Sequence, residues 1–159
     1  MHTSNYIYHD GELDLHGFVA YDKTVNTPQP AVLVVHDWSG RNEFACHQAK
    51  ELAKLGYVGF AVDMYGESRE GHTIDEKKAL MEPLVHDRGL LLQRIQAGLD
   101  AVKTIAQVDV NKIAVIGFCF GGLCALDLVR SGAEIVGAVS FHGLLNKPDN
   151  ASCKTTQAK

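Results

Sequence analysis

The stretch Gly117-Phe118-Cys119-Phe120-Gly121-Gly122 decides the fold of this chain. An apolar run at residues 112–116 precedes it, and a helix-compatible run at residues 123–129 follows it. This order predicts a strand, a sharp turn and a helix, with the Cys119 thiol at the apex. The pattern is that of a nucleophile elbow, in which a reactive side chain sits on a tight, strained turn.

The glycines on either side of Cys119 have a steric reason. Side chains at Gly117 and Gly121 would collide with the neighbouring strand and helix. The N-terminus of the following helix would favour a thiolate over a thiol at Cys119 and offer free N–H groups to an oxyanion. The alternative is a small core cysteine, which is the commoner role of a buried Cys. The paired glycines favour the elbow.

Length and composition place the chain among single globular domains. It has 159 residues, of which 46% are hydrophobic and 21% charged, as is ordinary for a soluble protein. The net charge of −4 argues against a nucleic-acid or anionic membrane surface. No apolar run approaches the roughly 20 residues of a membrane span.

The N-terminal residues and the cysteines predict a cytoplasmic location for the protein. Residues 1–5 lack the basic and apolar regions of a signal peptide. The four cysteines are irregularly spaced and form no CxxC pair, which favours reduced thiols. They are Cys46, Cys119, Cys124 and Cys153.

Strand and helix patterns alternate along the chain. Residues 6–8 and 13–21 predict short early strands joined by a turn at Asp10-Gly11. Continuously apolar runs predict strands buried on both faces, at residues 31–35, 57–62 and 135–141. Residues 43–55 predict a helix that ends at Gly56.

The middle of the chain contains a polar segment followed by a segment with a helical apolar pattern. Residues 64–83 are polar and turn-rich, which predicts a surface excursion with one short helix. Apolar residues then recur at helical spacing, at Leu91, Ile95, Leu99, Val102 and Ile105. Repeated strand–helix units with apolar strands predict an α/β fold: a doubly wound, mostly parallel sheet in a single domain over residues 1–159.

Polar and aromatic residues follow the strands at their carboxyl ends, where such sheets bind ligands. The segments are His36-Asp37-Trp38-Ser39-Gly40, Asp63-Met64-Tyr65-Gly66-Glu67, the elbow at Cys119, and His142-Gly143. We therefore expect them to converge on one rim of the sheet.

In combination these motifs resemble the dienelactone hydrolase family, over about residues 11–147. The resemblance implies an α/β-hydrolase fold and a Cys-His-Asp triad that opens lactones or cleaves small esters. It implies no metal and no organic cofactor.

The resemblance also assigns roles. Cys119 would be the nucleophile, and the backbone N–H groups of Phe120 and Trp38 would form the oxyanion hole. Asp37 would contact the resting thiol and take part in its activation. From the residues alone, Asp37 is equally a turn or helix-capping acid, and Trp38 a packing aromatic.

Two features depart from the family pattern. The best-studied members place an arginine clamp for the substrate carboxylate after an Asp-Leu-Tyr motif. At that place this chain reads Asp63-Met64-Tyr65-Gly66-Glu67 and has Glu67. Its charge would repel a carboxylate, and Arg69 is the nearest cation that could substitute. We therefore do not expect a dienelactone to be the substrate.

The second departure concerns the triad. In this fold the acid and His lie on later strand-end loops than the nucleophile. Residues 142–159 contain no further strand pattern, and Asp149 comes too early to be the triad acid. We therefore expect a hydrolase domain that lacks the last strands of the full fold.

His142 is the best replacement for the missing base, because it follows a strand beside the elbow. The alternative, a histidine that satisfies local backbone groups, is favoured for His142 and more strongly for His36. Without later strands, the strand from Ile135 to Phe141 would form an apolar edge. We expect association there, by self-pairing or with a partner.

Other function classes remain open at this stage. An inactive fragment or small-ligand binding module could keep the elbow pocket without turnover. A nucleotide- or flavin-binding domain is disfavoured, because the first apolar strand lacks a following G-x-G-x-x-G. A zinc enzyme is disfavoured by the absence of HExxH spacing.

Overall fold

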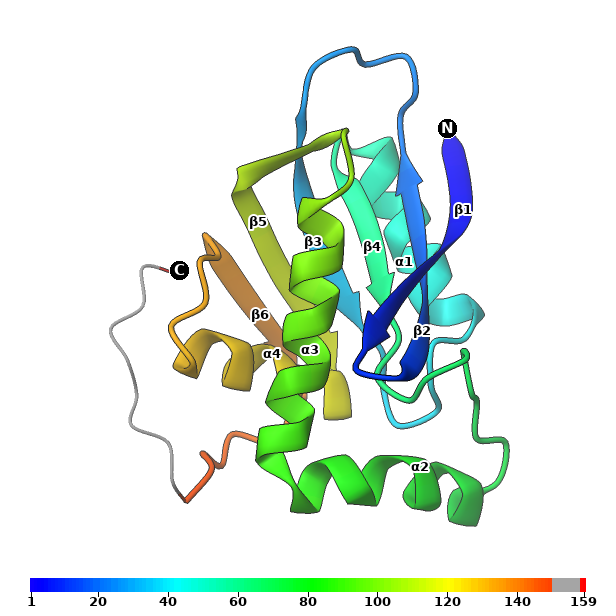
Figure 1. The fold of residues 1–159 in the computed structure, drawn as a ribbon, viewed down its shortest axis with the longest axis vertical. Helices are drawn as coiled ribbons and strands as arrows, with labels where there is room; N and C mark the ends of the chain where they lie inside the picture. The colour runs from blue at the N-terminus through cyan, green and yellow to red at the C-terminus, as the bar shows by residue number, and fades with distance from the viewer. Residues whose placement is uncertain (150–157) are drawn as a thin grey trace.

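The computed structural model describes residues 1–149 and 158–159, and it contains one six-stranded sheet with helices on both faces (Figure 1). The strand order is β1-β2-β4-β3-β5-β6. β3 to β6 pair in parallel, while β1 and β2 pair antiparallel to each other, and β2 antiparallel to β4. The predicted mostly parallel α/β sheet is confirmed.

The strands largely match the sequence patterns. They are β1 (His2–Asp10), β2 (Leu13–Tyr21), β3 (Gln29–Val35), β4 (Val58–Val62), β5 (Val108–Phe118) and β6 (Gly137–Phe141). β1 is longer than predicted, because its polar side chains alternate between exposed and half-buried positions along a sheet edge. The predicted turn at Asp10-Gly11 joins β1 to β2, and Gly11 takes a positive φ of 61° there.

The helices are α1 (Glu43–Lys54), α2 (Ile74–His86), α3 (Arg88–Lys103) and α4 (Phe120–Arg130). α2 is longer than the one short helix predicted before Pro83, and it continues through that proline. Thr73 and Glu76 form a capping box that starts α2. Asp87 lies between α2 and α3. Its side chain caps the start of α3 by accepting a hydrogen bond from the Leu90 N–H.

Two apolar layers lie against the sheet. α1 packs its alanines on one face, against Ala20, Val34 and Ala61. α3 and α4 cover the other face and share the larger core. In Figure 1, α3 crosses the near face of the sheet and α1 lies behind it.

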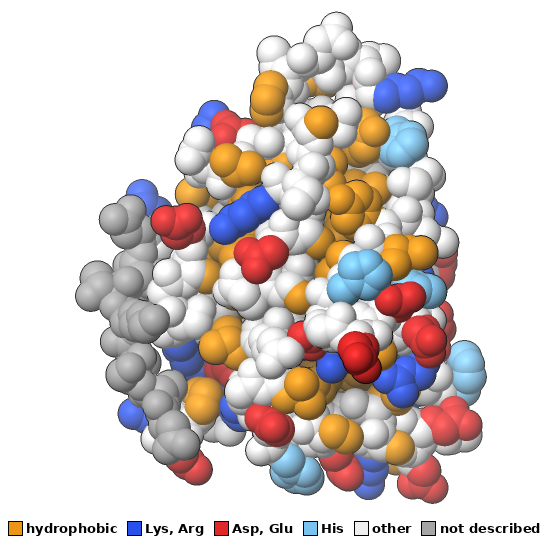
Figure 2. All heavy atoms as spheres, in the orientation of Figure 1, with side chains coloured by type: hydrophobic (Ala, Val, Ile, Leu, Met, Phe, Trp, Pro, Cys, Tyr) orange, Lys and Arg blue, Asp and Glu red, His pale blue; other side chains and the backbone are white. Residues whose placement is uncertain are grey.

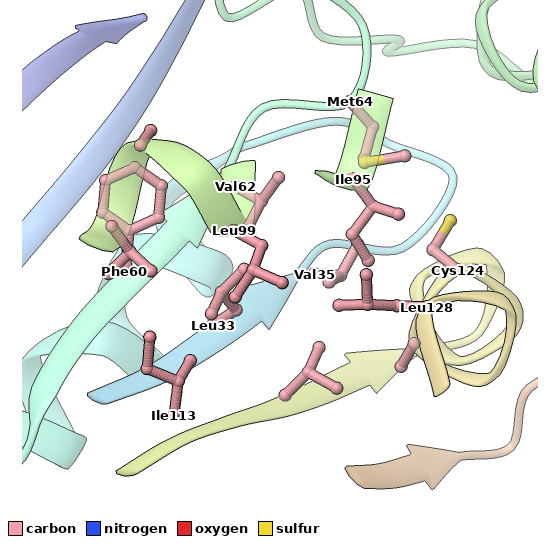
Figure 3. Close-up of a cluster of buried hydrophobic side chains, with 14 of the residues drawn as sticks. Leu33, Val35, Phe60, Val62, Met64, Ile95, Leu99, Ile113, Cys124 and Leu128 are labelled. Atoms are coloured by element: carbon pink, nitrogen blue, oxygen red, sulfur yellow. The ribbon is translucent and has the colours of Figure 1, made fainter. Parts of the chain in front are cut away.

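The larger core joins α3, α4 and the central strands. Figure 3 shows Ile95 and Leu99 of α3, Leu33 and Val35 of β3, and Leu128 of α4 converging on one apolar interior. The Cys124 thiol lies in the same interior and is fully buried, and burial raises its pKa. Cys124 therefore behaves as a small core residue.

β6 is the edge strand of the sheet over the described residues, and part of its outer side is paired. The Ala138 N–H donates to the Lys159 carbonyl (2.9 Å), and the Lys159 N–H donates to the Val136 carbonyl (3.2 Å). Val139 and Phe141, further along β6, are 47% and 43% exposed. The prediction of no further strand falls mainly on residues 150–157, which lie outside the described residues.

The surface carries charges of both signs. Figure 2 shows acidic, basic and histidine side chains intermixed over the lower part of the face, around α2. Over the part of the chain that the structure describes, no helix is long and apolar enough to cross a membrane.

Candidate active site

Cys119 stands between β5 and α4 in a backbone conformation that side chains rarely adopt. Its φ is 54° and its ψ is −115°. A Cβ at Gly117 would lie 2.0 Å from the Gly121 carbonyl oxygen, and one at Gly121 would lie 2.2 Å from that of Val35. Both contacts are with backbone, so only glycine fits at either position. The sharp turn predicted from the glycine spacing is present.

Backbone donors surround the elbow. The Cys119 N–H is used, since it donates to the Phe141 carbonyl at 2.9 Å. Within residues 1–149 and 158–159, the N–H groups of Phe120 and Trp38 form no hydrogen bond. Phe120 is the first residue of α4, where N–H groups have no partner inside the helix. Both groups predicted as oxyanion donors therefore remain available.

Asp37 is held in a turn after β3. Its carboxylate accepts from the Ser39 N–H (2.8 Å), and its carbonyl accepts from the Gly40 N–H (3.4 Å). The turn-capping role considered for Asp37 is therefore observed. Its charge also reaches Tyr65, whose pKa it helps to raise.

Tyr65 links the two loops that follow β3 and β4. Its hydroxyl donates to the Trp38 carbonyl (3.1 Å), and its ring stacks on Phe120 with centroids 5.8 Å apart. Burial raises the pKa of Tyr65, and nearby acidic groups, among them Asp37, raise it further. The phenol is therefore a permanent hydrogen-bond donor beside the elbow.

His36 is 1% exposed, and both of its ring nitrogens are bonded. Nε2 accepts from the Met64 N–H (3.2 Å), so Nδ1 carries the proton and donates to the Asp37 carbonyl (2.5 Å). Burial lowers the pKa of His36, which keeps the ring neutral. His36 satisfies local backbone groups, which is the alternative favoured from the sequence, and has no free nitrogen to act as a base.

A buried carboxylate organises the loop after β4. Asp63 is fully buried and accepts from four backbone N–H groups at 2.8 to 3.0 Å. The donors are His16, Tyr65, Gly66 and Ser68. These bonds replace the water that the charge loses on burial, and they fix the loop that carries Tyr65.

The loops after β3 and β4 are also joined directly. The Gly71 N–H donates to the Ser39 carbonyl (2.9 Å), and Gly40 pairs with Glu70 in an isolated β-bridge. The Trp38 ring is half-buried against the core, and Lys77 of α2 lies 5.5 Å from its centroid. The packing role considered for Trp38 is therefore observed as well.

His142 follows β6 with a φ of 44° and an exposed side chain. Its backbone reaches the elbow, because the preceding carbonyl of Phe141 accepts from Cys119. Its imidazole forms no hydrogen bond or ion pair with any residue that the structure describes. The structure thus brings the peptide between Phe141 and His142 to Cys119, with no hydrogen bond between the side chains of His142 and Cys119.

Glu67 and Arg69, the residues expected to act on a substrate carboxylate, lie on the loop after β4. Glu67 is exposed and has a φ of 52°. The Arg69 guanidinium bends back and donates to the carbonyls of Tyr65 and Gly66. Arg69 is therefore occupied by its own loop. Among the described residues, no cluster of His, Cys, Asp and Glu could hold a metal ion.

The family model for the dienelactone hydrolase family matches residues 15–159, nearly the whole chain. The chain belongs to the dienelactone hydrolase family. A candidate carboxymethylenebutenolidase from Aquifex aeolicus is 34% identical over 134 residues, which are 80% of this chain and 56% of that protein.

Solved structures agree with this assignment. The dienelactone hydrolase-like promiscuous phosphotriesterase P91 from metagenomic libraries has a TM-score of 0.89 and 34% identity. The match covers 93% of this chain and 62% of P91. A dienelactone hydrolase homologue from Klebsiella pneumoniae has a TM-score of 0.79 at 21% identity, which supports the fold. The chain spans about half the length of the curated relatives it matches.

Proposed function

We propose that this domain is a thiol hydrolase of small esters or lactones, with Cys119 as its nucleophile. The observation that carries the proposal is the positive φ of Cys119 between two glycines that no other residue could replace. A strained backbone at this point exposes the side chain at the top of the sheet. Family membership supports the reaction class.

The proposed chemistry uses two steps. The Cys119 thiol gives up its proton and its sulfur attacks the ester carbonyl carbon; an S–C bond forms, the C–O bond breaks, and the leaving oxygen takes a proton and departs as the alcohol. Water then attacks the thioester, the C–S bond breaks, one water proton returns to the sulfur, and the acid is released. The N–H groups of Phe120 and Trp38 would stabilise the oxyanion in both steps.

The supporting roles are proposals too. Asp37 would contact the resting thiol, and its support is that Asp37 and Cys119 both lie near enough to Tyr65 to influence its pKa, which burial chiefly raises. His142 would act as the base, and its support is that its backbone adjoins the elbow. A free Cys119 thiol suits the reducing cytoplasm, which we propose as the location.

The test is hydrolysis of p-nitrophenyl acetate by the wild-type chain and its Cys119→Ala variant. We expect p-nitrophenolate release that disappears in the variant. Cys124→Ala is the matched control, because it removes a buried thiol five residues away on α4 and should leave release intact. Equal release by wild type and Cys119→Ala would contradict the proposal.

The time course separates three interpretations of the site. Sustained release identifies a hydrolase. A single burst of one equivalent identifies an elbow that is acylated without turnover, and binding without any release identifies a ligand-binding module. The p-nitrophenolate group leaves as an anion, so the first step needs no proton donor.

We also propose that two chains associate through β6. The support is that β6 ends the described sheet and exposes Val139 and Phe141 beyond the contacts of Lys159. Sedimentation at rising concentration should show a dimer that Val139→Lys weakens. A strictly monomeric chain at high concentration would contradict this.

A further inference from the structure

The direction of the Trp38 N–H is fixed by its own peptide group. That N–H belongs to the Asp37–Trp38 peptide, which is planar and trans, like every described peptide bond. In a trans peptide the C=O and N–H point in opposite directions. A group that fixes the direction of the Asp37 carbonyl therefore also fixes the direction of the Trp38 N–H.

The Gly40 N–H reaches that carbonyl at 3.4 Å, but the shorter bond comes from His36. Its Nδ1–H donates to the Asp37 oxygen at 2.5 Å, and its Nε2 is anchored by the Met64 N–H. The ring is buried, so water does not compete for the bond. Met64 is held in turn, since its carbonyl accepts from Arg94 of α3 (2.9 Å). The imidazole thus connects the peptide before Trp38 to a fixed point of the core.

Tyr65 holds the peptide on the other side of Trp38. Its hydroxyl donates to the Trp38 carbonyl, which belongs to the Trp38–Ser39 peptide. Its ring packs against His36 at 4.7 Å and against Phe120 at 5.8 Å. Both peptide groups that flank the Trp38 Cα are therefore restrained by buried side chains.

We infer that His36 and Tyr65 are positioning residues that fix the Trp38 N–H for oxyanion binding by restraining the two peptides around it. The inference rests on the proposed function. Neither side chain would touch the substrate. Their loss should slow the attack on a carbonyl, which forms an oxyanion, and leave untouched a reaction of Cys119 that forms none.

Two reactions of Cys119 make this distinction measurable. Acylation by p-nitrophenyl acetate passes through an oxyanion, whereas alkylation by iodoacetamide is a displacement at saturated carbon and does not. Both products are followed on the Cys119 peptide by mass spectrometry. The ratio of the two rates reports the oxyanion donors separately from the nucleophile.

Tyr65→Phe is the first variant, with Tyr8→Phe as its matched control. Each change removes one hydroxyl from a buried tyrosine, and the Tyr8 hydroxyl bonds the Asp63 backbone instead of Trp38. We expect acylation to fall about tenfold in Tyr65→Phe, part of the roughly 10²-fold or greater loss caused by removing a donor outright. Alkylation should not change, and Tyr8→Phe should change neither rate.

His36→Asn and His36→Ala form the second pair. The Asn amide nitrogen lies where Nδ1 lies, so it can keep the bond to the Asp37 carbonyl, whereas Ala removes it. We expect acylation to be retained in His36→Asn and to fall at least about tenfold in His36→Ala. In the wild type, ¹⁵N spectra should show a His36 ring protonated at Nδ1 only.

Each result decides the inference. Equal acylation-to-alkylation ratios in wild type, Tyr65→Phe and His36→Ala would overturn the positioning role alone. A His36 ring protonated at Nε2 would also overturn it. A wild-type Cys119 that is alkylated but never acylated would overturn the positioning role and the proposed function together.

Discussion

Arg88 and Asp127 form a two-point ion pair between α3 and α4, with both N–O distances at 2.7 Å. Arg130 approaches the same carboxylate at 3.2 Å. The two arginines also donate to the carbonyls of Asn146 and Leu145, beyond β6. One buried acid thus joins two helices to the segment that follows the last strand.

Asp127→Asn should destabilise the domain strongly. The change leaves two mostly buried guanidinium groups without a counter-charge, which costs about 3–5 kcal/mol in comparable pairs. Urea denaturation measures the loss. The exposed pair of Lys50 and Glu43 is the control, and Glu43→Gln should leave the midpoint unchanged. Equal midpoints for wild type and Asp127→Asn would contradict the prediction.

Gly121→Ala should displace the elbow. The new Cβ would meet the backbone oxygens of Val35 and His36 at 2.2 and 2.5 Å, and backbone cannot rotate away. We expect a loss of about 1–3 kcal/mol in unfolding free energy, together with loss of Cys119 acylation. Gly89→Ala in α3 should be tolerated, because its nearest neighbour is a side-chain oxygen of Asp87 at 3.3 Å. An acylation rate unaffected by Gly121→Ala would argue against the packing described.

Stability should fall on acidification through His36. Burial lowers its pKa in the folded state below the ordinary 6.5. Above pH 6.5 neither the folded nor the unfolded chain binds this proton, so stability is insensitive to it. Below pH 6.5 the unfolded chain binds it and the folded chain does not, which costs up to about 1.4 kcal/mol per pH unit until the folded pKa is reached.

The measurement is the unfolding free energy of wild type and His36→Asn between pH 7.5 and 5. The variant has no imidazole at this position, so its stability should fall less steeply over this range. Parallel curves for the two proteins would show that His36 is protonated in the folded state and contradict the buried, neutral ring.

His142→Asn tests the proposed base. If His142 assists both steps, sustained hydrolysis should fall by about 10²–10⁴-fold. His86→Asn is the control, because it removes another exposed histidine, at the end of α2. Unchanged turnover in His142→Asn, or a wild type that shows a burst alone, would remove His142 from the mechanism.

The local parts of the fold could be predicted from the sequence because their causes are local. Apolar runs define β3 and β4, and the spacing of Leu91 and Ile95 defines α3. The elbow is readable for the same reason, since its glycines lie within two residues of Cys119. The family resemblance pointed to the N–H groups of Phe120 and Trp38 as oxyanion donors. Over the described residues both groups remain free of hydrogen bonds.

The supporting contacts could not be predicted, because they join distant residues. His36 bonds Met64 and Tyr65 bonds Trp38, each across more than 25 positions. In the sequence, Asp63 was noted only as part of the segment that follows the second buried strand. Its role in fixing the loop after β4 depends on four N–H groups that come together only in the folded chain. The continuation of α2 through Pro83 was not predicted either, because a proline inside a helix removes one backbone hydrogen bond and normally ends the helix.

The conformation of Cys119 has an evolutionary consequence. A φ of 54° with a ψ of −115° is natural for glycine and costs any other residue about 1–3 kcal/mol. Cys119→Gly should therefore raise the thermal stability of the domain while removing its thiol. A chain selected only to stay folded would drift towards glycine at this position. The proposed role of Cys119 as nucleophile would explain why a cysteine is kept there at that cost in stability.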